Sequence, residues 1–528
     1  MTGRSTARPH YVAEILARLA RAPERPGIRW RGRVLTAGDL LGSVLHACER
    51  LRTARVGEGS TVGILTEVNH PLTLTVRYAA HLLGATVVHI RSTNPGSDRP
   101  LSLADQAAIL AECGARHLVV DPPHAERADR LREYLATGPT ATGLSTTVLD
   151  LADRVGEMGS PPGPPGPALS PECAVVTYTS GSTGRPKGIR QSFAAWNHLV
   201  LADAAFLAGR GETMLIVTPT SHTVAVMADV VLASGGTLVL HEHFDAAQVL
   251  SAIETERITR TYLTVPQLYR LLDQPELADT GLSSLRQLVY SGCPASPARL
   301  DAAFRAFGPS LVQCYGSTEA GRITLLDQLD HYEPELRPSV GRPFPGVAVR
   351  ICDPASGREL PEGRTGEVQV RSPHLMTGYQ GDPERTAAVL HDGWLRTGDL
   401  GHWDRYGYLH LVDRIDRVIK CDGERIHPAE VEKALLAHPA VADCAVYGAR
   451  DDDAIEQVHA AVVLVRAVEP AELRRHVATL LSPRHAPSRI TRWAELPLTD
   501  TGKPDQRCLQ TGSATGAIQV LEESELTS

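Results

Sequence analysis

The chain has 528 residues, of which 42% are hydrophobic and 22% are charged, and its formal net charge is −8 at pH 7. A chain of this length exceeds one compact core, so we expect two to four domains or subdomains. The negative charge gives no reason to expect nucleic acid as a partner. No run of 18 apolar residues and no secretory signal occur, which argues against a membrane span. Nine scattered cysteines favour reduced thiols in a cytoplasmic protein without a zinc site.

The first third of the chain predicts alternating helices and strands. Residues 10–52 predict a helix, a short hairpin and a second helix. Helical patterns follow at 71–83 and 103–113, between strand-like runs at 61–65, 85–90 and 117–121. This alternation is typical of an α/β fold with a largely parallel sheet.

A loop rich in proline and glycine, 159–171, interrupts this alternation, which then resumes. The later strand-like runs are 175–178, 213–217, 237–240, 261–264, 287–290 and 311–315. Short hairpins are predicted over 347–370, and a smaller αβ module follows Arg414. The polar tail 511–528 is expected to be disordered.

Lysine is rare in this chain, with four lysines against 49 arginines. Lysine is a slender point charge on a flexible stem, whereas arginine is a wide planar fork. A lysine that persists in such a chain is a candidate for a role that a guanidinium cannot fill, with chance survival as the alternative. Lys187, Lys420 and Lys503 lie in motifs, and Lys433 is expected on a helix surface.

The first motif, Tyr178–Gly188, follows a strand and contains three glycines, two serines, two threonines and Lys187. Backbone N–H groups and hydroxyls of such a loop can surround a polyphosphate, to which lysine adds a cation. It is not a Walker A loop, because that motif ends in Gly-Lys-Ser/Thr, whereas here Gly188 and then Ile189 follow Lys187. A flexible surface loop is the alternative.

The second motif, Gln313–Gly321, places Tyr315, Thr318 and Glu319 at the end of a strand. An aromatic ring, a hydroxyl and a carboxylate suit a base, a phosphate and a divalent cation. The alternative is a strand-turn-helix junction in which Thr318 caps the helix.

The third motif, Trp394–Leu400, contains Asp399 after a glycine. A carboxylate in this position could accept both hydroxyls of a ribose, and an ordinary turn aspartate is the alternative. The fourth segment, Asp413–Glu432, begins the small module, and Lys503 lies near the end of that module.

Taken in order, these five pieces resemble the adenylate-forming superfamily of acyl-CoA synthetases, adenylation domains of nonribosomal peptide synthesis, and luciferases. The resemblance covers roughly residues 10–510. It implies an α/β fold whose large N-terminal domain, 1–413, has two stacked α/β subdomains and a small β-barrel. A small mobile α+β C-terminal domain, 414–510, follows it.

The resemblance implies that ATP and Mg²⁺ bind to the large domain. Tyr315 packs on the adenine, Gly316 belongs to the cofactor-binding residues, Thr318 contacts the α-phosphate, and Glu319 helps bind Mg²⁺. Asp399 takes the ribose hydroxyls. The residues that hold the pyrophosphate end are Thr179, Ser180, Gly181, Ser182, Thr183, Gly184 and Lys187.

The remaining implied roles belong to the small domain and its junction. Arg414 assists at the ribose, Asp416 is the hinge, and Gly423 lines the route of a pantetheine thiol. Lys503 bridges the substrate carboxylate and the α-phosphate. Displacement of pyrophosphate by the acid gives an acyl-adenylate, and losing one group that stabilises the transition-state charge typically costs about 3–4 kcal/mol. Domain closure then prepares the second step.

The acid is expected to lack an amino group. His222 occupies the place where amino-acid-activating members carry an Asp for the substrate ammonium. A histidine that is mostly neutral at pH 7 would not neutralise that ammonium. We therefore expect an aryl or aliphatic carboxylic acid, and a packing role for His222 is the alternative.

The expected acceptor is the thiol of coenzyme A. The alternatives are a separate carrier protein, since no carrier domain follows Lys503, and an amine, as in amide synthetases. A luciferase-like oxygenase is a remote alternative that O₂ uptake would reveal. Intact Lys503, Glu319 and Asp399 argue against a nucleotide sensor without catalytic activity.

Overall fold

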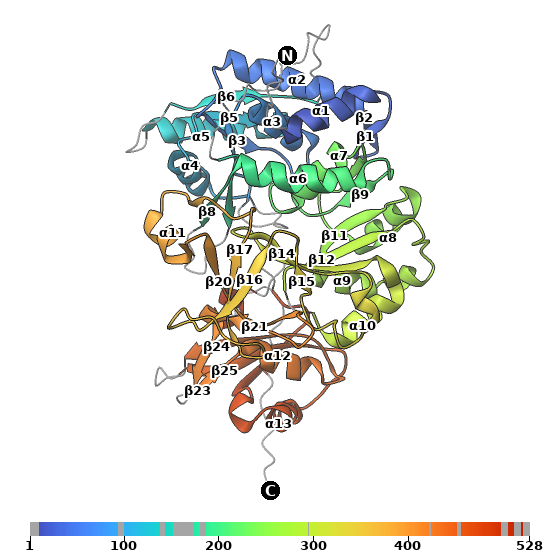
Figure 1. Ribbon diagram of the computed structural model, residues 1–528, viewed down its shortest axis with the longest axis vertical. Helices are drawn as coiled ribbons and strands as arrows, with labels where there is room; N and C mark the ends of the chain where they lie inside the picture. Colours follow the sequence, from blue (N-terminus) through green and yellow to red (C-terminus); the bar gives the residue numbers. More distant parts are fainter. Residues whose placement is uncertain are drawn as a thin grey trace, which may run out of the picture.

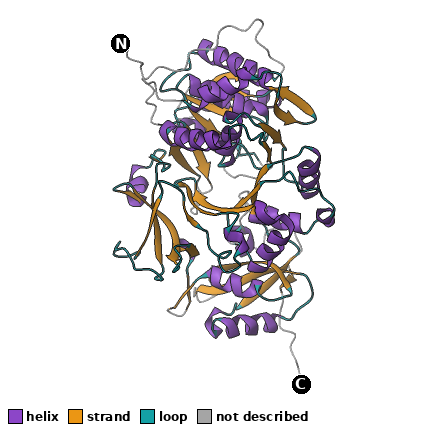
Figure 2. Ribbon diagram, turned by 45° about the vertical axis from the view of Figure 1, so that its right-hand side comes forward, coloured by secondary structure: helices purple, strands orange, loops and turns teal. Residues whose placement is uncertain are grey.

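The computed structural model describes residues 10–92, 100–137, 143–151, 173–179, 186–293, 295–421, 424–450, 456–497, 505–511 and 519–520. Figure 1 shows the N-terminal helices at one end of the long axis and the C-terminal module at the other. Helices pack against the strands of two large sheets (Figure 2). These sheets confirm the predicted α/β architecture.

The first large sheet has seven strands in the order β18-β8-β7-β4-β3-β5-β6. The strands from β7 to β6 are parallel, and β8 and β18 add antiparallel at one edge. Its strands are β3 Thr61–Leu65, β4 Thr86–His89, β5 His117–Val120, β6 Ser145–Val148, β7 Val175–Thr179, β8 Lys187–Gln191 and β18 Gly378–Tyr379. Its connecting helices are α3 Pro71–Leu82, α4 Leu103–Glu112 and α5 Ala125–Thr137.

The second large sheet has nine strands in the order β15-β14-β13-β12-β11-β9-β10-β1-β2. It is parallel from β13 to β1, with antiparallel strands at both edges. Its strands are β1 Pro26–Trp30, β2 Arg33–Thr36, β9 Thr213–Ile216, β10 Thr237–Leu240, β11 Arg260–Thr264, β12 Gln287–Ser291, β13 Leu311–Ser317, β14 Gly321–Leu326 and β15 Arg342–Pro343. The associated helices are α1 Tyr11–Arg21, α2 Ala37–Thr53, α6 Phe193–Leu207, α7 Val224–Ala233, α8 Ala246–Thr255, α9 Val265–Leu272 and α10 Pro297–Phe307.

One hydrophobic core joins both large sheets through α1, α2, α3, α6 and α7. A buried ion pair lies within it: Arg77 on α3 donates from Nη2 to Asp229 Oδ1 on α7 at 2.5 Å. The Tyr78 hydroxyl donates to the same oxygen at 2.5 Å, and Trp196 Nε1 on α6 donates to Oδ2 at 2.8 Å. Breaking such a buried pair typically costs about 3–5 kcal/mol, so this contact anchors three helices.

A five-stranded antiparallel sheet follows and forms the small half-barrel. Its strands are β16 Ala348–Cys352, β17 Gly366–Arg371, β19 Leu390–His391, β20 Trp394–Trp403 and β21 Leu409–Arg414. Helix α11, Pro383–Val389, lies between β18 and β19 in the chain. The predicted hairpins are therefore confirmed as parts of one sheet.

The C-terminal module has its own sheet and its own hydrophobic core. Its elements are β22 Ile419–Cys421, β23 Glu424–Ile426, α12 Pro428–Leu436, β24 Val441–Arg450, β25 Glu456–Leu464, α13 Pro470–Leu480, β26 Arg489–Trp493, α14 Gln506–Thr511 and β27 Gln519–Val520. Within the tail 511–528, whose disorder stays a prediction, Gln519–Val520 forms a short edge strand that pairs with β26. The domain bounds 1–413 and 414–510 stay predictions.

Candidate active site

The residues predicted to bind the phosphates come from both large sheets. Thr179 and Lys187 lie opposite each other on the antiparallel strands β7 and β8. Lys187 Nζ contacts Glu319 Oε1 at 2.6 Å, and the two side chains are 22% and 15% exposed. Glu319 lies in the turn between β13 and β14 of the other sheet. The loop residues Ser180–Gly184 lie outside the described part of the chain, so their roles stay predictions.

Glu319 is held as a carboxylate. Burial favours its neutral form, but the Lys187 ammonium and several hydrogen bonds outweigh burial and lower its pKa. The Tyr379 hydroxyl donates one of these bonds to Oε1 at 3.2 Å. The Thr179 hydroxyl is buried and has no hydrogen-bond partner among the residues that the structure describes. An ionised oxygen ligand, an ammonium and an unpartnered hydroxyl fit a triphosphate with Mg²⁺.

The ribose end lies where the half-barrel meets the C-terminal module. Asp399 on β20 pairs in register with Arg414 on β21. The Tyr315 hydroxyl donates to Asp399 Oδ2 at 2.5 Å, and Arg414 Nη1 donates to Oδ1 at 3.3 Å. Arg414 Nε also donates to Asp416 Oδ1 at 3.0 Å. The structure thus brings together the four residues predicted to serve the adenosine and the hinge.

The turn that carries Thr318 is a β-hairpin. Strand β13 continues to Ser317, and β14 begins at Gly321. The helix-cap alternative for Thr318 is therefore wrong, since Arg322–Leu326 pairs as a strand instead of forming a helix. Gly316 has no room for a side chain, because an added Cβ would lie 2.4 Å from the Gly321 carbonyl oxygen.

His222 lies between β9 and α7 and is 8% exposed. Burial lowers its pKa to about 4, so its imidazole is neutral at pH 7. Its Nε2 atom has no hydrogen-bond partner among the residues that the structure describes. Burial, and then the positive charge of Arg77, lower the pKa of His89 to about 3, so this imidazole is also neutral at pH 7.

The predicted hinge residue Asp416 lies in a single 3₁₀ turn, Ile415–Arg417, and its side chain is exposed. Lys433 lies exposed on α12, which confirms the predicted helix-surface position. Gly423 and Lys503 lie outside the described residues, so their roles stay predictions.

Tyr379 is a site residue that the sequence analysis missed. Its ring centroid lies 5.3 Å from Lys187 Nζ, and its hydroxyl contacts Glu319. Tyr379 lies in a two-residue strand and in no motif that indicates its chemistry. The neighbouring Gly378 was the only sequence signal that could have identified this position.

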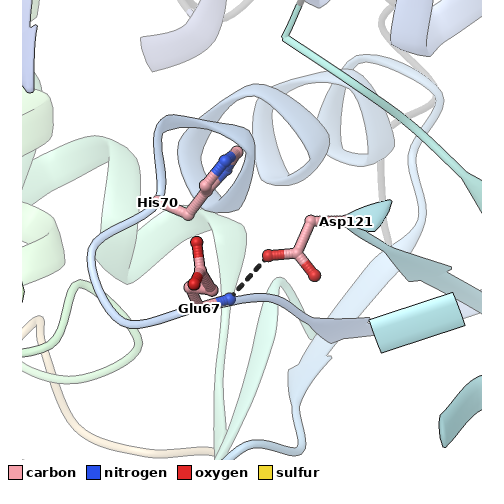
Figure 3. Close-up of side chains that lie close together, drawn as sticks. All are labelled: Glu67, His70 and Asp121. Atoms are coloured by element: carbon pink, nitrogen blue, oxygen red, sulfur yellow. Dashed lines mark hydrogen bonds between the residues drawn. The ribbon is translucent and has the colours of Figure 1, made fainter. Parts of the chain in front are cut away.

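A second polar cluster lies at the ends of β3 and β5 (Figure 3). Ligand atoms of Glu67, His70 and Asp121 lie within 4.8 Å of one another. The Glu67 N–H donates to Asp121 Oδ2 at 2.8 Å, and the Leu72 N–H donates to His70 Nδ1 at 3.2 Å. His70 Nδ1 therefore accepts, which places the ring proton on Nε2 and leaves no nitrogen for a metal. We interpret the cluster as a set of hydrogen bonds that stabilises the segment between β3 and α3.

The AMP-binding enzyme family model matches residues 16–380, and the AMP-binding enzyme C-terminal domain model matches residues 430–503. The chain therefore belongs to the AMP-binding enzyme family. This confirms the predicted superfamily, its fold and its use of ATP and Mg²⁺. The chain is an adenylate-forming acid–thiol ligase of the acyl-CoA synthetase type.

Two similar curated proteins are CoA ligases. The chain is 34% identical over 508 residues to the medium/long-chain-fatty-acid–CoA ligase FadD8 of Mycobacterium tuberculosis, covering 92% of this chain and 86% of the relative. It is 35% identical over 489 residues to feruloyl-CoA synthase of Amycolatopsis sp, covering 91% and 94%.

Two solved structures share the fold over nearly the whole chain. The amide bond synthetase McbA from Marinactinospora thermotolerans has a TM-score of 0.82 and 35% identity, covering 95% of this chain and 99% of its own. The o-succinylbenzoate CoA synthetase of Bacillus subtilis, in complex with ATP and magnesium ion, has a TM-score of 0.77 and 26% identity, covering 93% and 98%. Within the described residues, no helix has the length and apolar character needed to cross a membrane.

Proposed function

We propose that this ligase activates a carboxylic acid without an α-amino group, aryl or aliphatic, and transfers the acyl group to coenzyme A in the cytoplasm. The observation that carries the choice of acid is His222. An imidazole carries no negative charge for a substrate ammonium, and burial lowers the pKa of His222 to about 4, so the ring is neutral at pH 7. Burying an unpaired ammonium costs several kcal/mol, which disfavours amino acids.

The nearby carboxylate on α7 cannot replace the missing charge. Asp229 is fully buried, and both of its oxygens accept hydrogen bonds from Arg77, Tyr78 and Trp196. Its charge is already paired with Arg77. A substrate amine would have to compete with a guanidinium for this carboxylate, so Asp229 is no ready partner for a substrate ammonium.

The ion pairs Lys187–Glu319 and Arg414–Asp399 mark the proposed phosphate and ribose ends of an ATP site. Lys187 and Thr179 would hold the phosphates, and Glu319 would bind Mg²⁺. Asp399 and Arg414 would hold the ribose beside Tyr315, and Thr318 would contact the α-phosphate. Lys503 would reach the α-phosphate from the small domain, Asp416 would act as the hinge, and Gly423 would line the thiol route. When bound, ATP supplies the adenylyl group that turns the acid into an acyl-adenylate.

The matched pair 3-phenylpropanoate and phenylalanine tests the choice of acid, since the two differ only by the α-amino group. With ATP and Mg²⁺, we expect pyrophosphate release across a panel of fatty and aromatic acids that includes 3-phenylpropanoate, and none with phenylalanine. Equal release with both members of the pair would contradict the proposed role of His222. Formation of ADP and orthophosphate would contradict the adenylate route.

An amine is the second candidate acceptor, because the amide bond synthetase McbA shares 35% identity and a TM-score of 0.82 with this chain. A carrier protein is also represented among relatives, by a fatty acid–acyl-carrier-protein ligase of Streptomyces coeruleorubidus at 30% identity. Mass spectrometry of products from equal concentrations of CoA, carrier protein and a primary amine decides among them. We expect the CoA thioester, and an amide as the main product would reassign the enzyme.

A further inference from the structure

The segment Met376–Gln380 contacts both the turn that carries Glu319 and the strand that carries Lys187. The Met376 N–H donates to the Glu319 carbonyl oxygen at 2.7 Å, and the Gln380 N–H donates to the Gly188 carbonyl oxygen at 2.8 Å. Between these contacts, Tyr379 pairs in register with Ile189 of β8, the strand that begins at Lys187. The backbone therefore fixes Tyr379 between the strand of Lys187 and the turn of Glu319.

The side chain of Tyr379 is also constrained. Gly378 has a φ of +147°, and an added Cβ would lie 2.9 Å from Thr386 Cγ2, so a side chain at Gly378 would force Thr386 aside. Thr386 Oγ1 accepts the Tyr379 N–H at 2.9 Å. The tyrosine is 9% exposed, its ring lies 5.3 Å from Lys187 Nζ, and its hydroxyl donates to Glu319 Oε1 at 3.2 Å.

We propose that Tyr379 is a positioning residue that keeps the Glu319 carboxylate oriented for Mg²⁺ after Lys187 moves to the phosphates of ATP. This inference rests on the proposed roles of Glu319 and Lys187. Lys187 and Tyr379 both contact Oε1. When the ammonium leaves Oε1, the Tyr379 hydroxyl would still hold that oxygen, and the second carboxylate oxygen would remain available to bind Mg²⁺.

The ring has a separate role from the hydroxyl. An ammonium near the face of an aromatic ring is attracted to it, and this attraction persists when the hydroxyl is removed. Tyr379→Phe therefore removes only the bond to Glu319, whereas Tyr379→Leu also removes the attraction for Lys187. Metal-ligand orientation and lysine placement can thus be separated by two substitutions at one position.

The test measures metal binding directly, without catalysis. Free Mn²⁺, used as the probe in place of Mg²⁺, is titrated by electron paramagnetic resonance into enzyme with a non-hydrolysable ATP analogue. We expect Tyr379→Phe to weaken Mn²⁺ binding about tenfold, the lower end of the loss seen when a metal ligand's hydrogen-bond partner is removed. Binding of the analogue without metal should stay unchanged in Tyr379→Phe and weaken in Tyr379→Leu.

Two controls separate this role from a general structural one. Tyr406→Phe changes a tyrosine that is 55% exposed and should bind Mn²⁺ like the wild type. In a Glu319→Gln background, Tyr379→Phe should cause no further loss, because the two residues act through one contact. Wild-type Mn²⁺ affinity in Tyr379→Phe, or an equal loss with and without metal, would overturn the proposal. No acid or acceptor is present, so this result is independent of the proposed substrate.

Discussion

The two ends of the proposed nucleotide site are built in different ways. At the phosphate end, Lys187 on β8 of one large sheet and Glu319 in the turn after β13 of the other form one short ion pair. At the ribose end, Arg414 is 45% exposed and divides its guanidinium between Asp399 and Asp416. Asp416 lies on the 3₁₀ turn that leads into the C-terminal module.

This difference suggests that the two ends of the site affect different steps of the reaction. The phosphate end depends on contacts within the N-terminal region, so changes there should affect adenylate formation alone. The ribose end is connected to the turn before the small module, so changes there should also reach the transfer step. Substitutions at different points of the site can test whether the two ends affect different steps.

The largest effect is expected for Lys503→Arg, which alters the group that the small module would bring to the phosphate end. The wider guanidinium keeps the charge but not the shape. Adenylate formation should slow by about 100-fold or more, on the scale of one lost electrostatic donor. Transfer from supplied acyl-adenylate should persist, and single-turnover assays measure both steps.

Lys433→Arg is the matched control for this substitution. Lys433 is exposed on α12, so the exchange should change stability by less than about 0.5 kcal/mol and leave both steps unchanged. Near-wild-type adenylation by Lys503→Arg would mean that its retention in an arginine-rich chain is chance.

Asp416→Pro tests the ribose end at its link to the small module. Proline fixes φ, so the module should remain in one orientation. Transfer to the acceptor should fall by at least about tenfold while adenylation is retained, since closure prepares the second step. Asp416→Asn keeps the backbone free and is the control. An equal loss of both steps in Asp416→Pro would place the hinge elsewhere.

Arg414→Met removes the shared cation of the ribose end. We expect the KM for ATP to rise about fivefold, on the order of 1 kcal/mol of binding. The Tm should barely change, because ion pairs exposed to this degree contribute little stability. Steady-state kinetics and thermal unfolding check the two parts. An unchanged KM for ATP would show that the contact with Asp399 has no role in nucleotide binding.

The smallest effect is expected for His222→Ala, which belongs to neither end. The KM for the acid should change severalfold, and the KM for ATP should stay within about twofold, because the hydrogen bonds of His222 within the described residues run to Pro219 and Ala225. The pKa of His222 is lowered to about 4, so wild-type KM for the acid should show no inflection from this group near pH 6.5. Equal changes in both KM values would support a packing role.

Local sequence patterns predicted many of the strands that the described residues contain, but they did not predict helices such as α5, α6 and α8. Runs such as Val175–Tyr178 and Thr237–Leu240 are apolar because parallel strands are buried on both faces, and both form strands of the large sheets. The turn after Ser317 was harder to predict, because a glycine turn is compatible with either a helix or a strand after it. The segment after the turn forms strand β14 because it pairs with β13.

The candidate site was predictable where a motif carries its own chemistry. Lys187 and Glu319 were each identified within a motif, yet their contact spans 132 positions. Tyr379 was missed because its role comes from partners 60 and more positions away and not from its neighbours. The pairing of β27 with β26 was missed for the same reason, since a two-residue edge strand has no periodic pattern.

The buried pair of Arg77 and Asp229 has a consequence for redesign of this enzyme. It anchors α7 near the middle of the helix, while His222 and the first turn of α7 precede it. Val224 and Ala225 in the first turn are buried in the core, whereas positions 223, 226 and 227 are less buried. Libraries that vary positions 223, 226 and 227 and retain Asp229 should therefore keep more folded variants than libraries that vary Asp229.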